Sequence, residues 1–142
     1  MKVRQILDEK GRDVVTVPRE MELISAARFL SEQKIGAVVV SDGADGIAGI
    51  LSERDIVRAV SEKSAAALEA SAATFMTKEV VTCSEEHTVN QVMEIMTRGR
   101  FRHLPVVENG KIVGIISIGD VVRRRIEEIE REAEEIKAYI AS

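Results

Sequence analysis

The apolar residues of this chain follow two alternating patterns. One is a helical spacing of three and four that occurs in two segments 66 positions apart, at Leu23, Ala26, Ala27 and Leu30, and again at Val89, Val92, Met93 and Met96. It predicts two amphipathic helices, each with one buried face. The other pattern is a short run of β-branched residues, which predicts strands at 14–17, 35–42, 80–83 and 101–108.

The strands and helices are parts of an internal repeat. "SDGADGIAG" at 41–49 and "ENGKIVG" at 108–114 each predict a hairpin turn followed by a strand, and the second turn is one residue shorter. "GILSERDIVR" at 49–58 and "GIISIGDVVR" at 114–123 then share six of ten letters. Each copy therefore reads strand, helix, strand, strand, helix.

The repeat predicts an α/β (α+β) fold of two tandem β-α-β-β-α units. A unit of about fifty residues cannot bury its sheet face and its helix stripes alone, so we expect two units packed around a pseudo-two-fold axis. The expected division is repeat 1 at 1–62, a helical connector at 63–75, repeat 2 at 76–126, and a helical extension at 127–142.

The helical extension carries a narrow apolar seam. Its members are separated by steps of four and three through an otherwise charged helix, at Val122, Ile126, Ile129, Ala133, Ile136 and Ile140. This spacing is typical of a coiled-coil contact and favours a homodimer. The alternative is a helix that lies along its own domain.

Composition narrows the function classes. Of 142 residues, 45% are hydrophobic but only 3% are aromatic, and the net charge is −4, which argues against general nucleic-acid binding. A single cysteine, Cys83, excludes a disulfide within the chain and favours a reducing compartment, which we expect to be the cytoplasm. We expect neither a signal peptide nor a membrane-spanning segment.

The two copies resemble a pair of CBS domains, also called a Bateman module. The resemblance rests on the tandem β-α-β-β-α pattern and on the closing motif G-I-[LI]-S-x-x-D-[IV]-V-R, and it extends from about Val3 to Ile126. It implies a regulatory module without catalysis that binds AMP, ADP, ATP, S-adenosylmethionine or NAD(H) in clefts between the repeats. It also implies dimers and a regulated partner protein.

Both copies carry a serine followed three residues later by an aspartate: Ser52 with Asp55, and Ser117 with Asp120. A serine at a helix start can cap backbone N–H groups, which would leave the carboxylate free to face outward. A carboxylate accepts hydrogen bonds from the vicinal hydroxyls of a ribose. Together with the resemblance, this predicts that the four residues bind ribose; the alternative is that the aspartates are only caps.

A basic cluster occurs in the second copy alone. Arg100, Arg102 and His103 precede or begin an apolar strand, whereas Gly36 and Ala37 stand at the positions of Arg102 and His103 in the first copy. Guanidinium groups suit phosphate oxygens, and the resemblance implies that basic residues here reach a nucleotide phosphate. The alternative is a solvated loop.

The first copy offers a different phosphate partner, because Arg54 precedes Asp55 where Gly119 precedes Asp120. We therefore expect the two clefts to differ in affinity or in the nucleotide that they hold. The resemblance places the adenine against the first strand of each repeat and the strand before the serine, at Val15, Thr16, Val81, Thr82, Ile50 and Ile115. Ordinary strand composition explains these six residues equally well.

Other chemistries lack their usual residues. Cys83 stands where the first copy has Val17, which indicates a small buried side chain, and the two histidines have no metal-ligand spacing. "DGADG" at 42–46 is too short for a calcium loop. We therefore expect no metal and no enzyme, and keep two alternatives: nucleic-acid binding through a basic stripe formed by the arginines at 98–102 and at 123–125, and a pure protein-interaction module.

Overall fold

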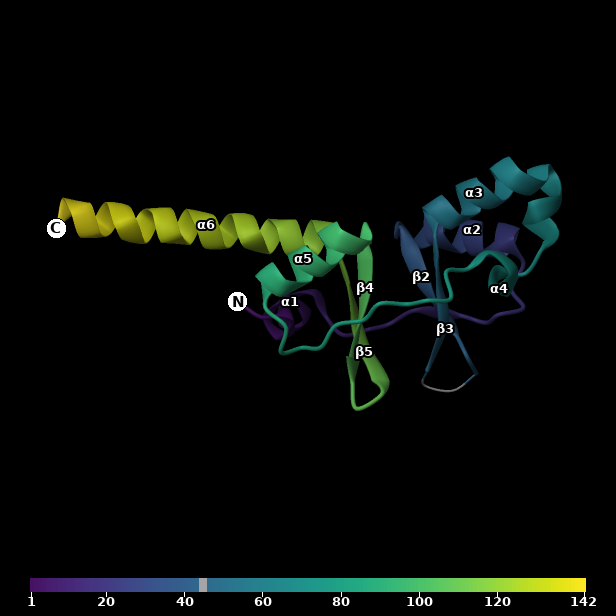
Figure 1. Cartoon of the computed structure of the whole chain (residues 1–142), viewed down its shortest axis with the longest axis horizontal. Coiled ribbons are helices and arrows are strands. Elements are labelled where there is room, and N and C mark those ends of the chain that lie inside the picture. The colour runs from purple at the N-terminus through teal and green to yellow at the C-terminus, as the bar shows by residue number, and fades with distance from the viewer. Residues whose placement is uncertain (44–45) are drawn as a thin grey trace. The chain divides into compact units, whose positions relative to one another are not determined.

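The computed structural model describes residues 1–43 and 46–142 and divides the chain into two compact units (Figure 1). Each unit consists mainly of one repeat. Unit 1 holds residues 1–12, 82–108 and 113–142, and unit 2 holds residues 13–81 and 109–112.

Unit 2 contains the first repeat in the expected order. The elements are β1 (Thr16–Val17), α2 (Leu23–Gln33), β2 (Ala37–Ser41), β3 (Ile47–Ser52) and α3 (Glu53–Lys63). The strand order is β1-β2-β3, with β1 parallel to β2 and β2 antiparallel to β3. The helical stripe predicted for α2 is buried against this sheet, since Leu23, Ala26 and Leu30 join the core with Val38, Val40 and Leu51.

The connector between the repeats is helical in two short pieces, η1 (Ser64–Glu69), a 3-10 helix, and α4 (Ala72–Phe75). After α4 the chain runs beside β3, where Thr77 pairs with Ile50 in an antiparallel bridge. The turn predicted at 42–46 includes residues 44 and 45, which lie outside the described residues.

Unit 1 contains the second repeat and one element that the sequence analysis missed. Its helices and strands are α5 (Val89–Gly99), β4 (His103–Glu108), β5 (Lys111–Ser117) from residue 113 on, the long α6 (Ile118–Ala141), and the unpredicted α1 (Val3–Lys10). The β4–β5 turn, Asn109-Gly110, is grouped with unit 2, and both of its φ values are positive, as a type I′ hairpin turn requires. Val3, Ile6 and Leu7 of α1 are buried in the core of this unit.

The strand predicted at 80–83 is wrong in extent, because only Cys83 pairs, in a parallel bridge with Val106. Cys83 N donates to Pro105 O at 3.0 Å, and Val107 N donates to Cys83 O at 2.8 Å. Pro105 occupies the position that Val39 holds in β2 and has no amide hydrogen, so the ladder cannot continue toward residue 81. In the first repeat both Thr16 and Val17 are paired.

The residues just before each repeat, here called its lead-in segment, pack in the unit that contains the other repeat. Leu7 precedes the first repeat but packs in unit 1 against Gly114, where a Cβ atom would lie 2.7 Å from its Cδ2. Met76 precedes the second repeat but packs in unit 2 against Gly49, where a Cβ atom would lie 2.7 Å from its Sδ. The glycine that opens each closing motif is therefore needed for the close approach of a lead-in segment.

Candidate functional site

The first Ser-x-x-Asp turn, in unit 2, forms a reciprocal capping box. Asp55 N donates to Ser52 Oγ at 3.2 Å, and Asp55 Oδ2 accepts from Ser52 N at 2.9 Å and from Ser52 Oγ at 3.0 Å. Asp55 Oδ1 accepts from Arg58 at 2.8 Å and from Thr77 Oγ1 at 3.2 Å. Both oxygens of this carboxylate are engaged, and the residue is only 3% exposed.

The second turn, in unit 1, has the same box with a different environment. Asp120 N donates to Ser117 Oγ at 3.2 Å, and Ser117 N donates to Asp120 Oδ2 at 2.8 Å. Lys10 Nζ donates to the same Oδ2 at 2.7 Å and to Ile115 O at 2.8 Å. Asp120 Oδ1 has no hydrogen-bond partner within the part of the chain that the structure describes, so one oxygen of this carboxylate stays available.

The ion pair with Lys10 stabilises the ionised form of Asp120. Burial by itself raises the pKa of Asp120, but the hydrogen bonds from Lys10 and Ser117 outweigh it and lower the pKa below its usual value. Asp120 is therefore ionised at neutral pH and acts only as a hydrogen-bond acceptor.

The expectation that serine capping leaves both carboxylates free is wrong. In each capping box the aspartate, at the third helical position, accepts a hydrogen bond from the backbone N–H of the serine. The serine hydroxyl in turn accepts a hydrogen bond from the backbone N–H of the aspartate. Ser52 and Ser117 are caps as expected. The two turns then differ in what else reaches the carboxylate: Thr77 and Arg58 at Asp55, but, among the described residues, Lys10 alone at Asp120.

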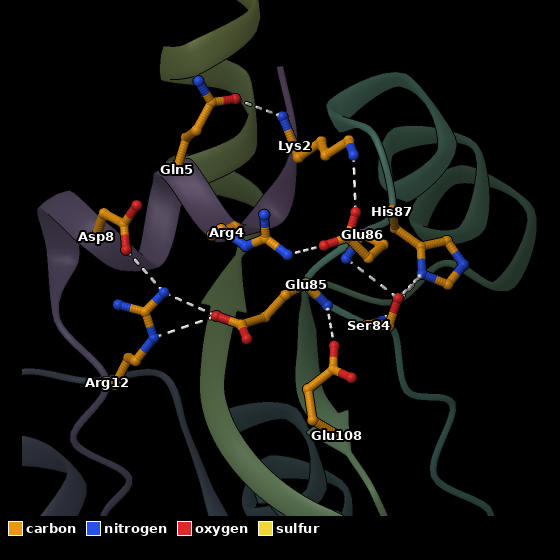
Figure 2. A network of polar contacts seen from close by, with 10 residues as sticks. All are labelled: Lys2, Arg4, Gln5, Asp8, Arg12, Ser84, Glu85, Glu86, His87 and Glu108. Atoms are coloured by element: carbon orange, nitrogen blue, oxygen red, sulfur yellow. Dashed lines mark hydrogen bonds and ion pairs between the residues drawn. The ribbon is translucent and has the colours of Figure 1, made fainter.

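Lys10 is held in place by the anchoring of α1. The start of α1 is tied to residues 84–88, where Val3 N donates to His87 O at 2.9 Å. Figure 2 shows Lys2, which precedes α1, in its ion pair with Glu86 at 2.7 Å. Beyond its end, Arg12 pairs with Glu85 at 2.7 Å. Lys10 therefore approaches Asp120 from a helix that is fixed at both ends.

A small cavity of about 170 Å³ lies beside this turn in unit 1. It is lined by residues of α1 and α6, namely Ile6, Glu9, Lys10, Asp120, Arg123 and Arg124. Arg124 pairs with Glu9 and Glu127, and the hydrogen bond that it donates to Glu9 is the main reason that its pKa is raised. The cavity is smaller than the pockets of about 300–1,000 Å³ that hold whole small-molecule ligands, so it fits only part of a nucleotide.

The predicted phosphate residues of the second copy lie close to its turn. Ile118 N, the first amide of α6, donates to Arg102 O at 2.8 Å, and His103 begins β4 directly after it. The side chain of Arg102 is exposed, and Arg100 ends α5 in the left-handed conformation with φ 58°. Arg54, at the start of α3 in unit 2, is likewise exposed.

The predicted adenine residues are divided between the units. In unit 2, Thr16 pairs with Val39, which pairs with Ile50, so these positions share one sheet, and Val15 precedes them exposed. Val81 is the last residue of the main segment of unit 2, whereas Thr82 and Ile115 belong to unit 1. The Ile115 carbonyl is an acceptor for Lys10 and its side chain is half-buried.

Several side chains weighed for other chemistries are engaged structurally. Burial, together with Glu108, raises the pKa of the Cys83 thiol to about 12, so this cysteine is not a nucleophile. His87 Nδ1 accepts from Ser84 N at 2.9 Å. Among the described residues no acidic, histidine or cysteine cluster is suited to a metal ion, and no helix is long and apolar enough to cross a membrane.

Three of the arginines considered for nucleic-acid binding are engaged in ion pairs. Arg124 pairs with Glu9 and Glu127, and Arg125 pairs with Glu128 at 3.2 Å. Arg98, near the basic cluster, pairs with Glu94 at 2.6 Å. These ion pairs do not favour a continuous basic surface for a phosphate backbone.

Comparison with known proteins agrees with the repeat and the fold. The CBS domain model matches the chain twice, over residues 3–62 and 72–127, and the chain belongs to the CBS domain family. A crystal structure of a CBS-domain containing protein from Agrobacterium tumefaciens is 54% identical, with a TM-score of 0.86, and the match covers 88% of this chain and 99% of that one.

More distant matches extend this relationship. A 17.7 kDa protein of Acidianus ambivalens is 35% identical over 96% of this chain and 82% of its own length. The chain spans only 58% and 23% of two Arabidopsis thaliana CBS domain-containing proteins. The CBS domain pair of protein MJ0100, solved with 5′-methylthioadenosine and S-adenosylmethionine, has a TM-score of 0.80 over 90% of this chain and 98% of that one. At 23% identity this last match shows the shared fold.

Proposed function

We propose that this protein is a non-catalytic regulatory module that binds an adenosine-containing nucleotide at the Ser117–Asp120 turn. The observation that carries the proposal is the Asp120 carboxylate, which is ionised and keeps Oδ1 without a partner among the described residues. An ionised carboxylate with one open oxygen accepts hydrogen bonds from ribose hydroxyls.

The neighbouring residues supply a plausible phosphate contact. The carbonyl of Arg102 is hydrogen-bonded to the first amide of α6, so the basic cluster at Arg100, Arg102 and His103 begins next to the turn. An exposed guanidinium can turn toward a phosphate without breaking an ion pair of the core. A nucleotide that carries a phosphate, such as AMP, ADP, ATP or NAD(H), would use this cluster, whereas adenosine would not.

Asp55 is the weaker candidate for a ribose contact. A ribose would have to displace Arg58 or Thr77 from Oδ1, or Ser52 from Oδ2, in a residue that is 3% exposed. Removing a buried hydrogen bond to a charged group costs about 1.5–3 kcal/mol, which a ligand hydroxyl would only restore. We therefore infer that the two turns have different tasks, a structural one at Asp55 and a ligand-binding one at Asp120.

The likeness to the MJ0100 domain pair supports the ligand class at the level of the fold, because that protein was solved with two adenosine-containing ligands. Regulation would follow if the nucleotide binds one conformation of the protein better than another and a partner protein recognises that conformation. The proposal includes a homodimer in the cytoplasm.

The test is a thermal-shift screen of adenosine, AMP, ADP, ATP, NAD(H) and S-adenosylmethionine, followed by calorimetry of the ligands that raise the Tm. A ligand present at 100 times its Kd stabilises the folded state by about 2.7 kcal/mol, so binding is visible as a shift. Arg102→Ala should weaken AMP far more than adenosine. If no adenosine compound shifts the Tm, the proposal fails; if Arg102→Ala weakens both ligands equally, Arg102 has no phosphate role.

A further inference from the structure

The C-terminal part of α6 is not covered by the other elements of unit 1. Every residue from 129 to 142 is exposed, and the helix extends well past α1 and α5 (Figure 1). The seam residues of this part are large and apolar: Ile129 is 49% exposed, Ile136 59% and Ile140 77%. Because a single helix gains most of its stability from packing, an exposed apolar seam needs another surface to cover it.

The charges beside the seam indicate what that surface is. In heptad terms Ile126, Ala133 and Ile140 occupy a, and Ile129 and Ile136 occupy d. Arg125 and Glu132 then flank the seam on one side, at g, while Glu130 and Lys137 flank it on the other, at e. In a parallel coiled coil each g residue faces the e residue five positions further along the other helix.

This register pairs opposite charges in a parallel arrangement. Arg125 faces Glu130 of a second copy, Glu132 faces Lys137 of a second copy, and symmetry repeats both pairs. An antiparallel arrangement with the same seam overlap faces Glu130 with Glu130, Glu132 with Glu132, and Arg123 with Lys137, all of like charge. Like charges across a helix contact are destabilising, so the flanking residues disfavour this antiparallel register relative to the parallel one.

We propose that the C-terminal segment of α6 docks against the same segment of a second copy of this chain, parallel and in register, with the seam at Ile126, Ile129, Ala133, Ile136 and Ile140. Isoleucine at both a and d also accommodates a third parallel helix. In either case the α6 segments associate in parallel, and this association does not depend on the nucleotide site.

The first test is disulfide cross-linking of full-length protein in a Cys83→Val background. In a parallel, in-register pair, Ile136→Cys places two thiols opposite each other and should cross-link within minutes of mild oxidation. The control is Ala138→Cys, an exposed position on the opposite side of the same helix, which should cross-link at least about tenfold more slowly because its thiols point away from the seam.

The antiparallel alternative has its own signature. There residue 136 lies opposite residue 126, ten positions or about 15 Å from its counterpart, so a mixture of Ile126→Cys and Ile136→Cys chains would give mainly the mixed cross-link. A dominant mixed product, or equal rates for Ile136→Cys and Ala138→Cys, overturns the proposal.

The second test uses charge. Lys137→Glu places like charges opposite each other twice per pair and should raise the dissociation constant roughly tenfold, measured by analytical ultracentrifugation. The double variant Glu132→Lys with Lys137→Glu exchanges the partners and should restore the original association. If the single variant has no effect, or if the double variant fails to restore association, the paired charges do not determine the contact.

Discussion

The two Ser-x-x-Asp turns have the same local structure and opposite surroundings. Asp55 is buried and accepts hydrogen bonds from Ser52, Arg58 and Thr77. Asp120 is half-buried, and Lys10 is the one side chain within residues 1–43 and 46–142 that reaches it from outside its own turn. The difference arises from the exchanged lead-in segments, since Thr77 follows Met76 in unit 2 and Lys10 ends α1 in unit 1. The two copies of the Ser-x-x-Asp motif thus have different roles because a different lead-in side chain contacts each aspartate.

The largest expected effect is on stability at Asp55. Asp55→Ala removes the acceptor for buried donors and should lower the free energy of unfolding by about 3 kcal/mol, measured by urea denaturation. Asp120→Ala, at the half-buried turn, should cost about 1 kcal/mol. Equal losses for the two substitutions would contradict the division into a structural and a ligand-binding turn.

The exchanged lead-in segments predict a second difference. Gly49→Ala places its Cβ 2.7 Å from both Met76 Sδ and the Thr77 carbonyl, whereas Gly114→Ala meets only Leu7 side-chain atoms at 2.7–3.4 Å. Overpacking costs about 1–3 kcal/mol, and the larger loss is expected at Gly49 because a backbone carbonyl has less freedom to move. Calorimetric Tm values of the two variants test the order, and a larger loss for Gly114→Ala would contradict the exchange.

Lys10 predicts a pH dependence that is specific to the second turn. The pKa of Asp120 is lowered in the folded protein. Its ionised form therefore contributes fully to the free energy of unfolding above the pKa of an aspartate in the unfolded chain, about 3.9. This contribution is lost as the pH falls through the pKa of Asp120 in the folded protein. Lys10→Met should reduce this acid sensitivity when urea midpoints are compared between pH 6 and pH 2.5. Parallel pH curves for wild type and variant would show that the ion pair contributes nothing.

The smallest effect is expected at Cys83. Its thiol is buried with a pKa of about 12, and Val17 occupies the equivalent position, so Cys83→Val should change the free energy of unfolding by less than about 1.5 kcal/mol. A thiol reagent at pH 8 should label the unfolded protein but not the folded one. Rapid labelling of the folded protein would contradict its burial.

The fold was predictable because duplication doubles every weak signal. The spacing in α2 and α5, the paired hairpins and the two Ser-x-x-Asp turns each occur twice, so one copy supports the other. The strand predicted before Cys83 does not form because Pro105 has no backbone N–H to donate to it. This consequence could have been predicted from the sequence. The helix α1 had only a short signal in Val3, Ile6 and Leu7.

The surroundings of the two aspartates could not be predicted. The sequence pattern identifies a lead-in segment but not the sheet that it packs against, because the two sheets are similar. The structure shows that Leu7 packs against Gly114 and Met76 against Gly49. The capping boxes were partly predictable, because an aspartate at the third helical position commonly returns to the N-cap amide. Which donor from elsewhere reaches each carboxylate depends on tertiary contacts.

Isothermal titration calorimetry of wild type and Asp120→Asn with AMP tests most directly whether the nucleotide binds at the Asp120 turn and not at the Asp55 turn. We expect one binding event per chain in the wild type and an affinity at least about tenfold lower in Asp120→Asn, because a hydrogen bond to a charged acceptor contributes roughly 1.5–3 kcal/mol. Urea denaturation of the variant confirms that it is folded. Two equivalent sites per chain, or unchanged affinity in Asp120→Asn, would contradict the assignment of ligand binding to this turn alone.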